Sequence, residues 1–160
     1  MAWGDPVQDL KGLTEFDPLD DGDVVARCIY SEARGESQKG KAGVVWVISN
    51  RVSKNLSEFG GNSYKKVVLK KNQFDGMTKA AARQPDVTSQ AWKDCVSEAL
   101  ASTRSSNPIG KCLWFVGNSY YANNVVESGG NEYWNFGSGN KKIVEKVVIG
   151  NHTFFRIEGY

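Results

Sequence analysis

The sequence predicts an α+β fold in which helices come first and a small antiparallel sheet closes the chain. Three observations support this. Apolar residues recur at helical spacing between residues 23 and 100, aromatic and β-branched segments follow, and Gly150-Asn151 between two such segments is typical of a hairpin turn. With 160 residues and 40% hydrophobic content, the chain is long enough to bury a core without metal ions or disulfide bonds.

The chain opens with an acidic arm. Residues 1–22 hold two prolines and show no sustained helical or strand period. We expect this arm to pack Trp3, Leu13 and Phe16 locally and to contribute nothing to a functional site. A single domain is expected over residues 23–160.

Two helices are expected next. The first runs over residues 23–33, with Asp23 as N-cap and Gly35 as C-terminal stop. Ser37 can cap the second, which is apolar on nearly all sides over residues 42–48. Its β-branched content would also suit a buried strand, but its continuation through residue 52 favours a helix.

Glu32 is the only carboxylate placed against this apolar pattern. Val25, Cys28 and Glu32 recur at i, i+3 and i+7, so the glutamate lies on the apolar stripe of the first helix. Burial and the negative end of the helix dipole both favour the protonated form, which a general acid requires. The alternatives are a frayed helix end, or a structural pair with Arg34 or Arg51.

Shorter elements follow as far as residue 108. The expected order is a short helix over 64–69 capped by Ser63, a tight turn over 73–76, a helical piece over 80–85, and an amphipathic helix capped by Thr88 or Ser89.

The character of the chain changes after Cys112. Residues 113–116 predict a short strand, and the Asn-, Gly- and Ser-rich stretch up to Asn140 predicts a binding loop. Its aromatic side chains offer flat faces for sugar rings, with core packing as an equal alternative. Two hairpin strands, 143–149 and 152–157, are expected to close the fold.

Charge is unevenly distributed. The formal net charge is +2, but residues 1–23 carry seven acidic side chains and one lysine, so residues 24–160 carry +8. A basic body with 18 aromatic residues suits an anionic polymer such as nucleic acid or a bacterial wall glycan, and scattered solvated lysines are an equal alternative. Nucleic acid is not expected as a partner, because lysines and aromatic residues do not alternate within one element. No apolar run is long enough to span a bilayer.

Three cysteines and one histidine limit the possible chemistry. Cys28, Cys95 and Cys112 form no CxxC pair, so we expect free buried thiols. His152 is the single histidine, which excludes sites built from two or three imidazoles; we expect no metal ion and no cofactor. A Cys-His peptidase built on Cys28 or Cys112 with His152 is a weak alternative, since no residue is indicated that would orient the histidine.

Residues 32–36 read Glu-Ala-Arg-Gly-Glu, Gly40 follows, and residues 50–52 read Asn-Arg-Val at the end of the second helix. This combination resembles the spore cortex-lytic and cell-wall hydrolase family of the SleB and CwlJ type. Weaker matches are Gln73-Phe74, Leu113-Trp114-Phe115 and the closing segment 150–155.

The resemblance implies a lysozyme-like fold and cleavage of peptidoglycan between N-acetylmuramic acid and N-acetylglucosamine, with Glu32 as catalytic acid. It also implies a lytic transglycosylase, in which the muramic acid C6 hydroxyl attacks C1 and closes a 1,6-anhydro ring. The implied partner is the glycan strand. The candidate substrate-binding residues are Gln73, Phe74, Trp114, Phe115 and His152 from the matched motifs, with Tyr120, Tyr121 and Trp134 from the aromatic stretch.

Three positions depart from the family pattern or leave it open. Asp75 stands where relatives commonly have serine; it is either a second carboxylate for hydrolysis with water or, more simply, a turn cap. Glu36 is either a second carboxylate or a structural acid that bonds backbone amides at the start of the second helix. Trp46 stands where relatives have a small residue.

A second class of function stays open: a non-catalytic glycan-binding or virion structural module on the same fold. It is motivated by the aromatic stretch and by an N-terminus without the features of an export signal. We expect action on the bacterial wall or spore cortex, by a spore enzyme or by a phage lysin released through holins or carried in the virion. Spore-coat, holin or virion proteins are the expected partners in these settings.

Overall fold

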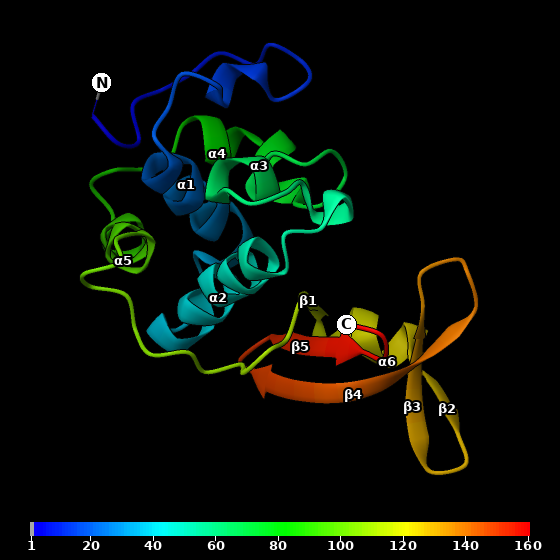
Figure 1. Cartoon of the computed structure of the whole chain (residues 1–160). Helices are drawn as coiled ribbons and strands as arrows, with labels where there is room; N and C mark the ends of the chain where they lie inside the picture. Colours follow the sequence, from blue (N-terminus) through cyan, green and yellow to red (C-terminus); the bar gives the residue numbers. More distant parts are fainter. Residues whose placement is uncertain (1) are drawn as a thin grey trace.

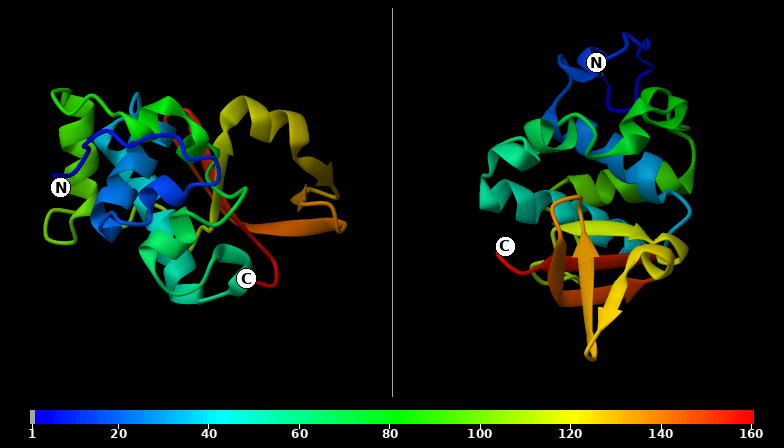
Figure 2. Two further views of the ribbon diagram at one scale, coloured as in Figure 1. Left: turned by 90° about the horizontal axis from the view of Figure 1, so that it is seen from above. Right: turned by 90° about the vertical axis from the view of Figure 1, so that its right-hand side faces the viewer.

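The computed structural model describes residues 2–160 and has an α+β fold (Figure 1). Helices α1 to α5 gather in one half, the antiparallel sheet and α6 form the other, and the β2–β3 end of the sheet extends away from α1 to α5 (Figures 1 and 2). The predicted fold class is therefore confirmed. No helix among residues 2–160 combines the length and apolar content needed to cross a bilayer.

The helices are α1 (Asp21–Ala33), α2 (Gln38–Lys54), α3 (Tyr64–Val68), α4 (Ala80–Arg83), α5 (Gln90–Ala99) and α6 (Asn118–Asn124), with short 3₁₀ turns η1 (Thr14–Phe16), η2 (Ser57–Phe59) and η3 (Asp75–Thr78). The strands are β1 (Trp114–Gly117), β2 (Val126–Ser128), β3 (Asn131–Asn135), β4 (Asn140–Ile149) and β5 (His152–Ile157).

Helix α1 begins two residues earlier than predicted, and its expected caps are wrong. The N-cap is Asp20, and Asp23 instead lies buried in the first turn, where it accepts hydrogen bonds from the Gly4 amide (3.0 Å) and Arg27 Nε (2.8 Å). The buried Arg27 needs a counter-ion, which explains this use of Asp23. At the other end Arg34 is right-handed, and Gly35 does not adopt the left-handed conformation of a stop.

Three predicted serine caps are confirmed. The Ser37 side chain accepts from the Gly40 amide at the start of α2, Ser63 from the Lys66 amide in α3, and Ser89 from the Trp92 amide in α5. The buried segment 42–48 lies within α2 and is helical, as its length indicated.

Helix α2 packs directly on the sheet. A Cβ placed on Gly43 would lie 2.5 Å from the Phe154 ring, so the absent side chain lets this helix approach β5 closely. The main core, which includes Val44 and Ile48, continues from the helices onto this face of the sheet through Phe154 and Ile149.

The five strands pair in the order β1-β5-β4-β3-β2, all antiparallel. Strands β4 and β5 form the predicted hairpin around Gly150-Asn151, with Ile149 opposite His152. The face of the sheet that carries Phe155 holds a separate aromatic cluster with Tyr121 and Trp134.

The predicted binding loop between residues 117 and 140 is wrong, because α6, β2 and β3 occupy that stretch. The rings of Tyr121 and Trp134 stack at 5.4 Å, and each side chain is almost fully buried. This packing joins residues distant in sequence, so local composition did not reveal it.

The acidic arm packs on the body as well as on itself. Phe16 and Leu19 belong to the main core, and Arg27 of α1 donates to the Asp5 carbonyl. The Trp3 ring lies over Gly22, where a Cβ would be 2.2 Å away. The expectation of purely local packing is therefore corrected.

Candidate active site

Glu32 lies in the last turn of α1 and is partly buried. Gly76 of η3 packs against it: a Cβ on Gly76 would lie 3.2 Å from the Glu32 carboxyl carbon and 2.4 Å from Ser31 Oγ. Burial raises the pKa of Glu32, the charge of Asp75 raises it further, and a hydrogen bond from the Gly76 backbone works in the opposite direction. The carboxyl therefore keeps its proton to higher pH than an exposed glutamate does.

The Glu32 carboxyl lines a hollow of about 360 Å³ that also contains Arg34, Glu36 and His152. The glutamates and Arg34 come from the end of α1 and the segment after it, and His152 comes from the first position of β5. The hollow therefore lies where the helical half meets the sheet.

Glu36 is held in a different way. Its two carboxylate oxygens accept hydrogen bonds from the backbone amide (2.9 Å) and the side-chain Nδ2 (3.0 Å) of Asn151. Burial alone would raise the pKa of Glu36, but these bonds, the charge of Lys41 and, in acid, the protonated His152 bring it below the usual value. Its carboxylate bonds the β4–β5 turn, and not the start of α2 as expected.

The chain leaves space for this contact. A Cβ on Gly40 would lie 2.9 Å from Glu36 Cβ, and one on Gly150 would lie 2.6 Å from Glu36 Oε1. Gly150 also has φ +56°, a conformation that favours glycine. Gly40 and Gly150, which belong to the motifs noted in the sequence, therefore have a physical role: they leave room for Glu36 against the hairpin turn.

His152 lies beside these acids. Burial lowers its pKa and the Glu36 carboxylate partly offsets this, so the imidazole is neutral at neutral pH. Its Nδ1 atom is 3.9 Å from Glu36 Oε1 and has no hydrogen-bond partner among residues 2–160. The ring packs against Phe115, with centroids 5.1 Å apart.

Asp75 is exposed and does not cap its turn as expected. Its side chain is 83% accessible and lies 3.6 Å from Lys79 Nζ, while its backbone carbonyl accepts from Thr78 Oγ1. The N-cap position of η3 is held by Phe74, not by Asp75. The carboxylate of Asp75 is nonetheless close enough to Glu32 to raise the pKa of that acid.

A second cavity, of about 770 Å³, lies between α2, η2 and the start of β1. It contains the predicted residues Gln73, Trp114 and Phe115, and the buried Phe74 ring packs against Phe115 with centroids 6.3 Å apart. Gln73 lines this cavity and Gly76 packs against Glu32; the Cα atoms of Gln73 and Gly76, three peptide steps apart, are at most about 11 Å from each other.

The remaining predicted aromatic residues line neither of these two cavities. Tyr121 and Trp134 are 5% exposed, and the Tyr121 hydroxyl donates to Glu132 at 2.9 Å. Tyr120 is 59% exposed, with its ring 6.2 Å from Trp134. The flat faces expected of Tyr121 and Trp134 are therefore used in the sheet core.

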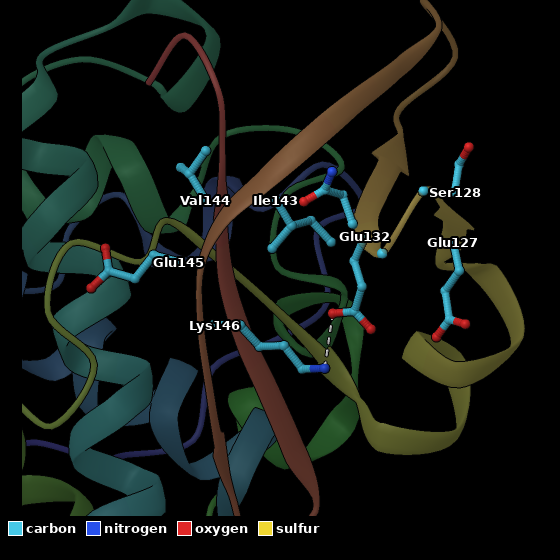
Figure 3. Close-up of a pocket in the computed structure, with 10 residues that line it drawn as sticks. Glu127, Ser128, Glu132, Ile143, Val144, Glu145 and Lys146 are labelled. Carbon is cyan, nitrogen blue, oxygen red and sulfur yellow. Dashed lines mark hydrogen bonds and ion pairs between the residues drawn. The ribbon is translucent and has the colours of Figure 1, made fainter.

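A third cavity, of about 720 Å³, lies against β2, β3 and β4 (Figure 3). Glu132 forms an ion pair with Lys146 there, at 3.0 Å. Burial alone would raise the pKa of Glu132, but hydrogen bonds from Lys146 and Tyr121 bring it below its usual value. This acid is ionised at neutral pH, so it is no candidate proton donor.

Sequence reasoning missed three residues around these cavities. Arg51 was noted only as part of a motif and as a pairing option, Gly76 only as part of a turn, and Tyr160 not at all. A charged residue three positions after the apolar segment 42–48 of α2 was the available signal for Arg51. Tyr160 reaches the second cavity through tertiary packing, which no local pattern indicates.

The cysteines behave as structural thiols. Cys28, Cys95 and Cys112 are free and buried, and burial raises the pKa of Cys112 to about 12. The thiolate that a cysteine peptidase needs is therefore not favoured. Among residues 2–160, no group of three or more His, Cys, Asp or Glu side chains is arranged to hold a metal ion.

Comparisons with known proteins agree with this geometry. A family model described as Cell Wall Hydrolase matches residues 35–155, a range that begins three residues after Glu32. The solved catalytic domain of the germination-specific lytic transglycosylase SleB from Bacillus anthracis has 20% sequence identity and a TM-score of 0.53, covering 85% of this chain and 93% of that one.

The solved catalytic domain of the Bacillus cereus SleB protein has 22% identity and the same TM-score, covering 85% of this chain and 89% of that one. A search of curated proteins found no match. The two structures show the shared lysozyme-like fold, and the family model covers about three quarters of the sequence. The chain therefore belongs to the cell wall hydrolase family.

Proposed function

We propose that this protein is a peptidoglycan lytic transglycosylase that cleaves the β-1,4 bond between N-acetylmuramic acid and N-acetylglucosamine. The observation that carries the proposal is Glu32, a partly buried acid of raised pKa that lines the hollow between α1 and β5. Its substrate lies in the bacterial wall or spore cortex, and the domain over residues 23–160 carries the activity.

Glu32 acts twice in the proposed reaction. Its carboxyl proton passes to the glycosidic oxygen, the bond from that oxygen to C1 breaks, and N-acetylglucosamine leaves with a new hydroxyl. The C6 hydroxyl of the muramic acid then attacks C1, and its proton returns to the Glu32 carboxylate. The product is a 1,6-anhydro ring, and no water is consumed.

The other acid of the hollow supports a one-carboxylate mechanism. Glu36 is bound through both oxygens by Asn151 and has a lowered pKa, so it is neither a proton donor nor a free base. Family membership and the fold of a protein described as a lytic transglycosylase agree with this reading. Gln73, Phe74, Trp114, Phe115 and His152 are the proposed substrate contacts.

The test uses purified peptidoglycan and mass analysis of the released muropeptides without prior reduction. Wild type is expected to release anhydro products, each one water lighter than the corresponding reducing product. Glu32→Gln should release them at least about 10²-fold more slowly, and the matched control Glu36→Gln should release the same products as wild type. If folded wild type releases no muropeptides, or Glu32→Gln releases them equally, the proposal is wrong.

Hydrolysis with water is the second candidate, because Asp75 is near enough to raise the pKa of Glu32. In that mechanism Asp75 would activate water or bind the sugar, and the products would keep a reducing end. Asp75→Asn distinguishes the two. Reducing products from wild type, together with loss of activity in Asp75→Asn, would favour hydrolysis. Anhydro products released by Asp75→Asn at an undiminished rate would exclude it.

A further inference from the structure

Two arginines are buried in the described part of the chain, and they are satisfied very differently. Arg27 is fully buried and pairs with the Asp23 carboxylate, while its other nitrogens donate to the backbone carbonyls of Asp5, Ala82 and Arg83. Every part of its guanidinium is used to join the arm, α1 and α4, which makes Arg27 a structural residue.

Arg51 is 4% exposed and forms no ion pair with any carboxylate among residues 2–160. Its Nε donates to the Leu113 carbonyl (2.8 Å) and its Nη1 to Gln73 Oε1 (3.1 Å). The rings of Phe59 and Phe74 lie 4.8 and 5.1 Å from the guanidinium carbon. The groups that touch the guanidinium are thus neutral; the Glu58 carboxylate of the same cavity raises its pKa from beyond ion-pair distance.

One edge of this guanidinium is open. Nη2 donates to no residue of the described chain, yet it is not among the unpaired polar atoms that are sealed from solvent. Arg51 lines the cavity of about 770 Å³, so this edge faces that space. Burial lowers the pKa of Arg51 to about 10, which still leaves it charged at neutral pH.

The acidic side chains of the cavity already have partners. Glu58 accepts from the Tyr160 hydroxyl, and Glu158 accepts from the Lys142 amide. Lys141 is the other cation that lines the cavity, and Trp114, Phe136 and Tyr160 supply aromatic surface. The space therefore suits a ligand with one anionic group and a ring, and its volume lies in the usual range for small-ligand sites.

We propose that Arg51 binds a carboxylate carried by the glycan strand, on the lactyl group of a muramic acid or on the peptide attached to it. The inference rests on the proposed function and adds an anion subsite in the cavity lined by Gln73, three residues before the Gly76 that packs on Glu32. A buried guanidinium that forms no ion pair gains most from a charge-assisted, two-point contact with a carboxylate. This would select muramic acid residues over neutral sugars.

Calorimetric titration of Glu32→Gln tests the subsite without turnover. The probes are N-acetylmuramic acid, its methyl ester, N-acetylglucosamine, and muramyl-L-alanyl-D-isoglutamine with its amidated form. We expect a free carboxylate to improve binding at least about tenfold over the matched neutral probe. Preference for N-acetylmuramic acid over its ester assigns the lactyl group, and preference between the two dipeptides assigns the peptide.

Three further substitutions in the same Glu32→Gln background test whether Arg51 causes the preference for a free carboxylate. Arg51→Gln should remove the carboxylate preference. Arg51→Lys should weaken it, because an ammonium group lacks the paired N–H donors with which a guanidinium binds both carboxylate oxygens. Lys141→Gln should leave the preference unchanged. Equal binding of acid and neutral probes overturns the proposal, as does a preference that survives Arg51→Gln or disappears with Lys141→Gln. If Arg51→Gln does not fold, the comparison of acid and neutral probes and the Arg51→Lys variant still test the proposal. Anhydro products from wild type without a carboxylate preference would overturn this inference alone.

Discussion

Glu32 and Glu36 are four residues apart in one motif, yet the fold gives them opposite properties. Glu32 lies against Gly76 with its pKa raised by burial, whereas Glu36 is gripped by Asn151 with its pKa lowered. Both line the same hollow. The difference arises from what reaches each carboxyl: chiefly burial in one case, two hydrogen bonds from a turn in the other.

This contrast indicates how one short motif can supply both chemistry and architecture. An acid that keeps its proton can donate it, and an acid that is ionised and bonded can fix the β4–β5 turn relative to α1. Because that turn carries His152 into the hollow, Glu36 shapes the site in which Glu32 is proposed to act.

The largest expected effect separates the two acids by activity. Glu32→Gln should reduce release of soluble muropeptides by about 10² to 10⁴-fold, the usual contribution of a general acid. Glu36→Gln should stay within about threefold of wild type per folded molecule. Initial rates on purified peptidoglycan, corrected for the folded fraction from circular dichroism, provide the measurement. Equal losses in both variants would remove the distinction.

Gly76→Ala should disturb only the Glu32 side of the comparison. The new Cβ would lie 2.4 Å from Ser31 Oγ and 3.2 Å from the Glu32 carboxyl carbon, so the end of α1 or η3 must shift. We expect a loss of about 1–3 kcal/mol in the free energy of unfolding, and a rate loss of about tenfold or more from misplacement of the acid.

Gly35→Ala is the matched control, because a Cβ there meets nothing within 4 Å and the backbone is not left-handed. Denaturant titrations and rates on the two variants should therefore differ clearly. Similar stability and activity for both would contradict the close packing of Gly76 on Glu32.

At pH 7 the substitutions Glu36→Gln and Glu32→Gln should affect the free energy of unfolding differently, because the pKa values of the two acids are shifted in opposite directions. Glu36 has a lowered folded-state pKa, so its contribution is present above the usual glutamate pKa and is lost as pH falls through the folded value. Glu36→Gln places an amide nitrogen opposite a donor of Asn151 and should lose about 1–2 kcal/mol at pH 7, with the difference shrinking in acid.

Glu32 has a raised folded-state pKa, so its favourable state is the protonated one and wild type loses stability as pH rises through the folded value. Glu32→Gln should therefore be at least as stable as wild type at pH 7. Urea unfolding at pH 4 and pH 7 tests both signs, and destabilisation by Glu32→Gln at pH 7 would contradict the raised pKa.

The smallest expected effect is a displacement of the pH profile. Activity should fall on the alkaline side as Glu32 loses its proton, at a pH above the usual 4.5 of a glutamate. Asp75→Asn removes a charge that raises this pKa, so it should move the alkaline limb to lower pH, while Glu36→Gln should leave it in place. Profiles of kcat/KM for the three proteins provide the test.

Much of the helical half was predictable because its signals are local. Ser37, Ser63 and Ser89 each bond an amide within three residues, and the apolar segment 42–48 was helical as its length indicated. The expected position of Glu32 on the buried side of α1 followed from spacing alone. Asp23 was assigned wrongly because its partners, Gly4 and Arg27, include a residue of the distant arm.

The sheet half was harder to predict for a physical reason. Residues 117–140 are rich in Asn, Gly and Ser, yet they form α6, β2 and β3 because Tyr121, Trp134 and Phe155 bury one another across distant segments. Likewise, Arg51 and Tyr160 meet at one cavity although 109 positions separate them in the sequence.

The sequence by itself determined the starts of α2, α3 and α5, the closing hairpin and the motif that contains both glutamates, since these depend on neighbours within a few residues. Only the tertiary structure decided that the pKa of Glu32 is raised, that the pKa of Glu36 is lowered, and that Arg51 forms no ion pair. Burial and hydrogen bonds set these properties, and both come from Gly76, Asn151 and the cavity walls, which the chain brings together only when it folds.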